Sequence, residues 1–336
     1  MEPRLKIRNL SKGFGGSRVV DDISFDVAAG EVVCLLGPSG CGKSTTLRMV
    51  AGVETETAGD IFLDGASLKG VPPEERSIGL MFQDFALFPH LSVRDNVAYG
   101  IKNKREGRAR AEALLQRVGL AEYSAKYPHQ LSGGEQQRIA LARALAPKPS
   151  VMLMDEPFSG LDERLRDEVR DDTLALLREE RAAVLLVTHD PQEAMRMADE
   201  IALMRDGKIV QLGPPEVLYA DPVDHKAAAF FSDINILPGI VEDGAVSTSL
   251  GAFASHGLQD GARAEIVIRP QHLHIGNGQP NASVLDRRFL GLFTVLTCEL
   301  NGSTRVSILQ QGEVSLDAGA QVCVEADRAR CMIFQA

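Results

Sequence analysis

Hydrophobic residues in this chain of 336 residues gather in short unbroken runs that are separated by helical patterns. The clearest apolar runs occupy residues 32–36, 78–82, 151–154 and 184–188. Helical patterns follow at residues 46–51, 161–180 and 192–200. A short apolar run without polar alternation is typical of a strand that is buried on both faces. The pattern therefore predicts a sheet domain whose strands are joined by helices.

Other stretches have a different pattern. Residues 5–10 alternate like a half-buried strand, residues 19–27 predict a strand with a turn at Asp21 and Asp22, and residues 59–65 predict a hairpin strand. Between about residues 91 and 150 the chain carries helical charge patterning and offers no strand candidate. This stretch predicts a helical subdomain inserted into the sheet domain.

The C-terminal third has the pattern of a separate domain. Residues 237–239 resemble a linker, and short β-rich runs follow at residues 266–268, 293–296 and 322–324. Glycine and asparagine turns separate these runs, as in a small all-β barrel or sandwich. We therefore expect a first domain at residues 1–236 and a β domain at residues 237–336.

A glycine-rich loop links the strand at residues 32–36 to the following helix. Its residues are Gly37, Pro38, Ser39, Gly40, Cys41, Gly42, Lys43, Ser44 and Thr45. Glycines let backbone N–H groups approach an anion closely, and the positive end of the helix dipole adds to the attraction. Lys43 can reach the β- and γ-phosphates, and Ser44 can ligate Mg²⁺. The alternative is a glycine-rich turn that binds nothing, but the strand–loop–helix context favours a nucleotide site.

Two acids end the strand at residues 151–154. Asp155 is placed to hold Mg²⁺, and Glu156 is placed to activate a water molecule as a general base. The alternative is that both acids begin a turn, since Pro157 follows them. Because a buried strand delivers both acids after a phosphate loop, the pattern favours hydrolysis chemistry.

Further candidates are weaker when they are taken alone. Ser132 precedes two glycines and a helix, and this arrangement serves either as a helix cap or as an anion site. Phe14 could stack on a purine, although a lone aromatic residue is more often simply packed. His189 ends the strand at residues 184–188 and could be an ordinary surface histidine.

Composition narrows the class of protein. The formal net charge of -10 argues against a general nucleic-acid binder. The N-terminal residues do not have the pattern of a secretory signal, and the chain has no apolar run of about 18 residues that could span a bilayer. Its five cysteines lack CxxC spacing and fit a reducing compartment without a metal cage. We expect a protein that is cytoplasmic and soluble when alone.

Taken together and in order, these motifs resemble the ATP-binding subunit of an ABC importer, and the likeness covers nearly all of the chain. The motifs are Walker A at residues 37–45, the Q-loop at Gln83, the signature at residues 131–137, Walker B at residues 151–155 with Glu156, the D-loop at residues 159–162 and the switch His189. Glu135 stands where many members have glutamine, and Gly160 where many have alanine. An ordered set of this kind is far more specific than any one of its motifs.

The resemblance implies an α/β P-loop NTPase with a RecA-like core, an antiparallel β subdomain and an inserted helical subdomain. It gives ATP and Mg²⁺ as ligands, Glu156, His189 and Gln83 as catalytic residues, and Ser44, Gln83 and Asp155 as the metal site. Phe14 occupies the place of the adenine-stacking aromatic. In a homodimer, one subunit's signature would complete its partner's site. The signature residues concerned are Ser132, Gly133, Gly134 and Glu135.

The C-terminal domain resembles the OB-like TOBE module of importers for ions, polyamines and sugars. Ile268, Arg269 and Pro270 fit its "RPE"-type segment, with Gln271 in place of the acid, and residues 233–239 look most like the ferric-iron branch. The resemblance implies an ATPase peripheral to the cytoplasmic face of a bacterial inner membrane, bound to permease subunits that receive solute from a separate binding protein. A soluble ABC ATPase of DNA repair or translation is an alternative, as is a ligand-sensing role of the C-terminal domain. The sequence leaves the imported solute open.

Overall fold

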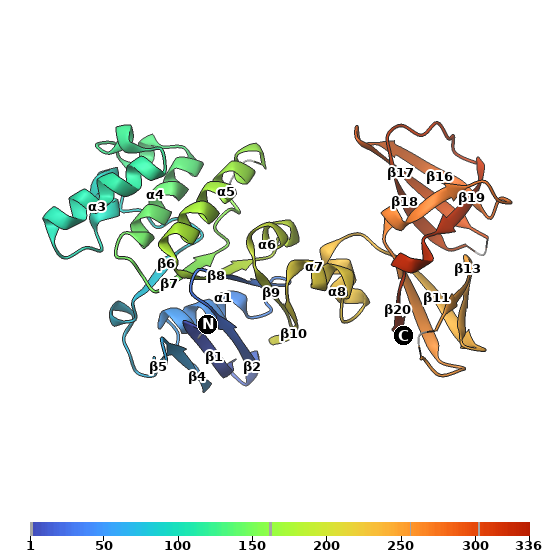
Figure 1. Ribbon diagram of the computed structural model, residues 1–336, viewed down its shortest axis with the longest axis horizontal. Helices are drawn as coiled ribbons and strands as arrows, with labels where there is room; N and C mark the ends of the chain where they lie inside the picture. The colour runs from blue at the N-terminus through green and yellow to red at the C-terminus, as the bar shows by residue number, and fades with distance from the viewer. Residues whose placement is uncertain (1–2, 161–162, 256, 302) are drawn as a thin grey trace. The chain divides into compact units, whose positions relative to one another are not determined.

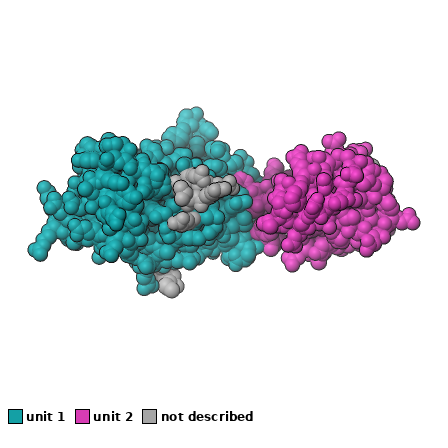
Figure 2. Space-filling model, turned by 90° about the horizontal axis from the view of Figure 1, so that it is seen from above, with its two compact units in different colours: residues 1–218 teal, residues 219–336 magenta. Residues whose placement is uncertain are grey.

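A computed structural model describes residues 3–160, 163–255, 257–301 and 303–336 (Figure 1). The chain divides into two compact units, Met1–Leu218 and Tyr219–Ala336 (Figure 2). The division therefore falls earlier in the chain than the expected boundary between residues 236 and 237. Within the described residues, no helix is both long enough and apolar enough to cross a membrane.

The linker predicted at residues 237–239 is wrong, because these residues lie inside strand β11 (Asn235–Glu242). Leu237 and Val241 are buried while Pro238 is exposed, which is the alternation of a strand with one face on a core. Pro238 is tolerated because β12 (Ala245–Thr248) pairs with β11 only from Ile240 onward. Proline and glycine at an incompletely paired part of a strand gave a false linker signal.

The first unit is built on a mostly parallel sheet with the strand order β10-β9-β3-β8-β7-β6. Its strands are β3 (Val32–Leu36), β6 (Ile78–Met81), β7 (Val151–Asp155), β8 (Ala183–Thr188), β9 (Glu200–Arg205) and β10 (Lys208–Gly213). The strands β3, β6, β7, β8 and β9 pair in parallel, and β10 is antiparallel to β9. The carboxyl ends of the parallel strands therefore meet at one edge, where a ligand site is expected in an open α/β sheet.

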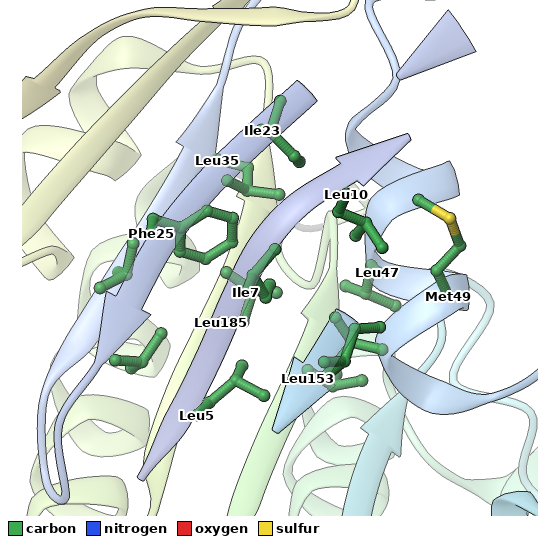
Figure 3. Close-up of a cluster of buried hydrophobic side chains, with 14 of the residues drawn as sticks. Leu5, Ile7, Leu10, Ile23, Phe25, Leu35, Leu47, Met49, Leu153 and Leu185 are labelled. Atoms are coloured by element: carbon green, nitrogen blue, oxygen red, sulfur yellow. The ribbon is translucent and has the colours of Figure 1, made fainter. Parts of the chain in front are cut away.

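An antiparallel sheet of order β2-β1-β4-β5 packs against this central sheet. Its strands are β1 (Leu5–Phe14), β2 (Ser17–Val27), β4 (Ala58–Leu63) and β5 (Ala66–Ser67). The turn predicted at Asp21 and Asp22 is instead a bulge within β2, where Asp22 has a φ of 57° and the pairing with β1 shifts register. Figure 3 shows Leu5, Ile7 and Phe25 of this sheet meeting Leu35 and Leu185 of the central sheet.

Helices of the first unit are α1 (Lys43–Ala51), α2 (Val93–Ala98), α3 (Lys104–Arg117), α4 (Gly133–Leu145), α5 (Glu163–Glu180) and α6 (Pro191–Met197). The helices α2, α3 and α4 lie in the stretch predicted to be a helical subdomain. The expectation of a helix through residue 200 is wrong, because Ala198 is extended and β9 begins at Glu200. Short 3-10 helices occupy Pro73–Glu75, Ala121–Tyr123, Pro128–Gln130, Pro270–His272 and Arg328–Arg330.

Beyond its first helices the second unit is built of β-strands, as predicted, with short 3-10 helices between some of them. Helix α7 (Pro215–Ala220) spans the unit boundary, and α8 (His225–Phe231) follows it. The sheets have the orders β13-β12-β11-β14-β20 and β15-β19-β16-β17-β18. Their further strands are β13 (Gly251–Ala254), β14 (Arg263–Ile268), β15 (Leu273–Gly276), β16 (Ala282–Phe289), β17 (Phe293–Leu300), β18 (Arg305–Gln311), β19 (Gln321–Ala326) and β20 (Met332–Gln335). Buried residues such as Leu237, Ile266 and Leu296 form one core between these sheets.

Arg269, singled out in the sequence, has a structural role in this unit. Its buried guanidinium donates to Ser232 Oγ at 2.8 Å and to the Tyr219 carbonyl at 2.6 Å, and it stacks 3.7 Å from the centroid of the Tyr219 ring. Gln271 donates to the Tyr219 hydroxyl at 2.8 Å. These contacts fasten the helical start of the unit to β14.

Candidate active site

The loop at residues 37–45 leaves β3 at the edge where the parallel strands end, and it runs into α1. Gly37 has a φ of 155°, and a Cβ there would lie 2.2 Å from the Met204 carbonyl oxygen. Gly42 has a φ of 104°, and its Cβ would lie 2.4 Å from the Val19 carbonyl oxygen. Both positions exclude any larger residue, so the loop is held closely against the neighbouring strands and its shape is fixed.

Lys43 is a buried cation whose partners among the described residues are neutral. Its side chain belongs to a residue that is only 5% exposed, and Nζ donates to the carbonyl oxygens of Gly37 at 2.7 Å and Pro38 at 2.9 Å. Burying an ammonium without an opposite charge is costly. A phosphate group in the loop would supply that charge, so these residues fit the phosphates of ATP.

Ser44 and Asp155 meet beside the loop. Ser44 Oγ donates to Asp155 Oδ1 at 2.9 Å, which joins the start of α1 to the end of β7. Burial raises the pKa of Asp155, and the nearby Glu156 charge raises it further, while the Ser44 hydrogen bond opposes both effects. A carboxylate in these surroundings would gain from a bound cation. Hydroxyl and carboxylate oxygens are ligands that suit Mg²⁺, so this pair fits the metal.

Glu156 and His189 come together from neighbouring strands. Glu156 follows β7 and His189 follows β8, and Glu156 Oε1 lies 3.0 Å from His189 Nδ1. Glu156 holds a φ of 46°, a conformation that non-glycine residues rarely adopt, and its amide donates to the Val187 carbonyl at 2.9 Å. The fixed backbone aims the carboxylate at the histidine, and both side chains remain open to water.

Gln83 and Ser159 extend this cluster. Ser159 Oγ donates to the Glu156 carbonyl at 3.0 Å, and Gln83 Nε2 donates to Ser159 Oγ at 3.4 Å. The structure thus brings Gln83 to the loop that carries Glu156, and its role as a metal ligand stays a prediction. Of the D-loop, residues 161–162 lie outside the described residues.

Phe14 is the last residue of β1, and it is 47% exposed. Lys12 Nζ lies 4.8 Å from the centroid of the Phe14 ring. An exposed ring beside a cation is suited to stacking against a purine. The adenine-stacking role of Phe14 stays a prediction.

The signature segment begins α4 on the helical subdomain. Ser132 Oγ accepts from the Glu135 amide at 3.4 Å, and the Ser132 amide donates to Glu135 Oε2 at 2.7 Å, which forms a capping box. The bonds that Glu135 Oε2 accepts from the Ser132 amide and from Ser132 Oγ hold the pKa of Glu135 below its usual value, the amide bond having the largest effect. Ser132 and Gly133 are exposed, whereas Gly134 is buried. The N-terminus of α4 is therefore exposed to solvent.

A group of buried polar residues next to His189 was not predicted from the sequence. Arg170, Thr188 and Glu193 are all 5% exposed or less, and they form hydrogen bonds or ion pairs with one another or with Asp190. In the sequence Arg170 is one charged residue among many in a helical pattern. The one available signal in the sequence was its spacing in α5, because Arg170 lies seven residues before the buried Leu177 and so on the same face of the helix.

Comparison with known proteins identifies two families in the chain. Residues 20–159 match the ABC transporter family, and residues 266–334 match the TOBE domain. The putrescine transport ATP-binding protein PotG of Escherichia coli is 42% identical over 83% of this chain and 78% of its own length. The Fe(3+) ions import ATP-binding protein FbpC of Haemophilus influenzae is 39% identical over 89% of this chain and 90% of its own length. The spermidine/putrescine import ATP-binding protein PotA of Methylococcus capsulatus is 41% identical over 89% of this chain and 82% of its own length.

Proposed function

The chain belongs to the ABC transporter family and is an ATPase of that family, and from this premise we propose that it drives solute import through a partner permease. The observation that carries the catalytic part of the proposal is the 3.0 Å contact of Glu156 with His189, beside the Ser44–Asp155 pair. The candidate base, the residue proposed to orient it and the pair proposed to hold the metal therefore lie at one sheet edge.

In this proposal, the backbone of residues 37–45 and the Lys43 ammonium bind the phosphates of ATP. Ser44 and Asp155 hold Mg²⁺, which supplies positive charge against the β- and γ-phosphate oxygens when bound. Glu156 accepts a proton from the attacking water, and His189 holds the Glu156 carboxylate in position. Gln83 is linked to the Glu156 carbonyl through the Ser159 hydroxyl, so a change at the nucleotide would alter the position of the Gln83 loop.

The signature segment supports a homodimer. Ser132 and Gly133 are exposed at the capped N-terminus of α4, and the bonds of the Ser132 side chain stay within its own segment, so this helix end is accessible to a nucleotide held by another subunit. A two-fold pairing would make this contact self-complementary and would give composite ATP sites. Each subunit would then contribute the phosphate loop of one site and the signature of the other.

A strained segment after Gln83 is the surface that we propose for the permease. Phe85 and Ala86 have φ values of 59° and 45°, and Arg143 of α4 donates to both of their carbonyl oxygens, at 2.9 and 2.6 Å. Phe88 packs on the exposed Tyr99 with ring centroids 4.3 Å apart. The segment joins the Gln83 loop to the helical subdomain, so movement at the nucleotide would reach it. Docking there would place the chain at the cytoplasmic face of a bacterial inner membrane.

The names of the relatives support a class of solute. Their names give ferric ions, putrescine and spermidine with putrescine, all of which are cations. We propose a cationic solute that a separate binding protein delivers to the permease, with ferric iron as the candidate that residues 233–239 suggested. In this proposal the permease and the binding protein, rather than the ATPase, select the solute.

Glu156→Gln tests the catalytic proposal. The amide keeps the shape of the side chain and removes the base, so the variant should bind MgATP normally and turn over about 100-fold more slowly or worse. Glu122→Gln, at an exposed position outside the site, is the matched control and should behave as wild type. Binding of a fluorescent ATP analogue and release of phosphate measure the two steps. Hydrolysis near the wild-type rate in Glu156→Gln would remove Glu156 from the mechanism.

A further inference from the structure

A buried arginine lies between the segment that carries Glu156 and the segment that carries His189. Arg170 of α5 is 5% exposed, and its guanidinium carbon lies 5.8 Å from the centroid of the Phe158 ring, two residues beyond Glu156. Arg170 Nη2 donates to Asp190 Oδ2 at 3.0 Å, directly after His189. One side chain therefore touches both segments.

Glu193 completes the link on the His189 side. Its Oε2 accepts from Thr188 Oγ1 at 3.0 Å and lies 3.5 Å from Arg170 Nη2. Thr188 Oγ1 in turn accepts from the Asp190 amide at 3.1 Å, and Asp190 caps α6 by accepting from the Glu193 amide at 3.3 Å. The residues on both sides of His189 are thus bonded to the buried pair or to each other.

This polar arrangement is costly because its charged groups are buried. Burial raises the pKa of Glu193 to about 7 against the opposing effect of Arg170. Arg170 Nε and Glu193 Oε1 are buried and make no hydrogen bond among the described residues. Well-packed apolar side chains often stabilise such a place as well as an ion pair does, so the pair is better explained by the geometry that it imposes.

We propose that Arg170 and Glu193 are positioning residues that hold His189 against Glu156 for hydrolysis. The inference rests on the proposed roles of Glu156 and His189. Without Arg170, Asp190 and Phe158 lose their common partner, and the 3.0 Å contact between Glu156 and His189 is no longer fixed from both sides. Phosphate binding at residues 37–45 does not involve this pair, so its loss changes turnover and leaves affinity for ATP unchanged.

A double-mutant cycle on the purified full chain tests the proposal. Arg170→Met should lower kcat for ATP about 10-fold or more, with KM changed less than about two-fold. His189→Ala should lower kcat as well, and adding Arg170→Met to it should have little further effect, because both changes disrupt the same contact. Arg178→Met is the matched control, since Arg178 lies on the same helix and makes an exposed pair with Asp199, 3.8 Å away. Its kcat should equal that of wild type.

The outcomes separate the inference from the proposal beneath it. If the two losses multiply in the double variant, Arg170 acts on the fold rather than through His189, and the inference is wrong. If His189→Ala is slow but Arg170→Met and Glu193→Gln are both as fast as wild type, the inference alone fails. If His189→Ala keeps wild-type turnover, the proposed role of His189 is wrong, and the inference that rests on it is wrong as well. Glu193→Gln, which keeps the side-chain shape, provides the same test should Arg170→Met not fold.

Discussion

Helices α1 and α4 both begin with glycine-rich segments, yet their N-termini are satisfied in opposite ways. The N-cap of α1 is Gly42 in a left-handed conformation, with no side-chain cap and no acid in the first turn. Helix α4 has Ser132 as its cap and Glu135 closing the box. An N-terminus without its own acceptor is suited to a ligand anion, whereas a capped one is stable without it. The N-terminus of α1 therefore suits the phosphates of the chain's own nucleotide, and in the proposed dimer the capped N-terminus of α4 would meet the nucleotide of the other subunit.

The largest expected effect comes from mixing two inactive variants, one for each helix end. Lys43→Ala removes the buried ammonium of the phosphate loop, and Ser132→Arg places a bulky charge on the exposed cap. In a mixed dimer one composite site carries both lesions and the other carries neither. With random pairing and independent sites, the mixture should recover about one quarter of the wild-type rate from near zero.

Controls decide how that mixture is interpreted. Each variant is measured alone at the same total concentration, and formation of mixed dimers is followed with two different affinity tags. Activity that stays at the level of the separate variants, although mixed dimers are present, would mean that each chain completes its own site. The contrast between the two helix ends would then have no functional meaning.

How well the sequence predicted each part depended on whether the relevant forces were local. The phosphate loop and its strand were predictable, because Gly37 and Gly42 meet backbone atoms that only glycine tolerates. The cap of α4 was also local, since Ser132 and Glu135 are three residues apart. Strand β11 was missed because proline and glycine usually mark loops. Arg170 was missed because its partner Asp190 lies on another segment, and no local pattern reports such a contact.

A smaller effect is expected in the segment that joins the Gln83 loop to the helical subdomain. Phe88→Ser removes the ring that packs on Tyr99 and should weaken association with the co-expressed permease about 10-fold, as loss of an aromatic contact residue commonly does. ATP hydrolysis by the chain alone should be unchanged, because Phe88 makes no contact with residues 37–45 among the described hydrogen bonds and ring contacts. Co-purification with the permease measures the first effect and phosphate release the second.

The matched control for Phe88→Ser is Phe289→Ser, since Phe289 is a large ring that is 55% exposed in the second unit. It should leave association with the permease unchanged. Equal loss in both variants would indicate a general effect of removing exposed aromatic rings. Unchanged co-purification of Phe88→Ser would place the permease contact elsewhere on the subunit.

The smallest expected effect concerns the capping box that satisfies the N-terminus of α4 from within its own chain. The bond from the Ser132 amide lowers the pKa of Glu135 in the folded chain. The charged form of Glu135 therefore stabilises the fold fully at pH values above 4.5, its pKa in the unfolded chain. That contribution is lost as the pH falls from about 4.5 through the lower folded pKa. Glu135→Gln should therefore lower Tm by roughly 1–2 °C at pH 7, and the difference should shrink as the pH falls below the unfolded pKa. Glu112→Gln, exposed on α3, should show neither effect. A Tm difference for Glu135→Gln that stays constant down to pH 3 would show that the charge does not hold the cap, and the contrast with α1 would then rest on Ser132 alone.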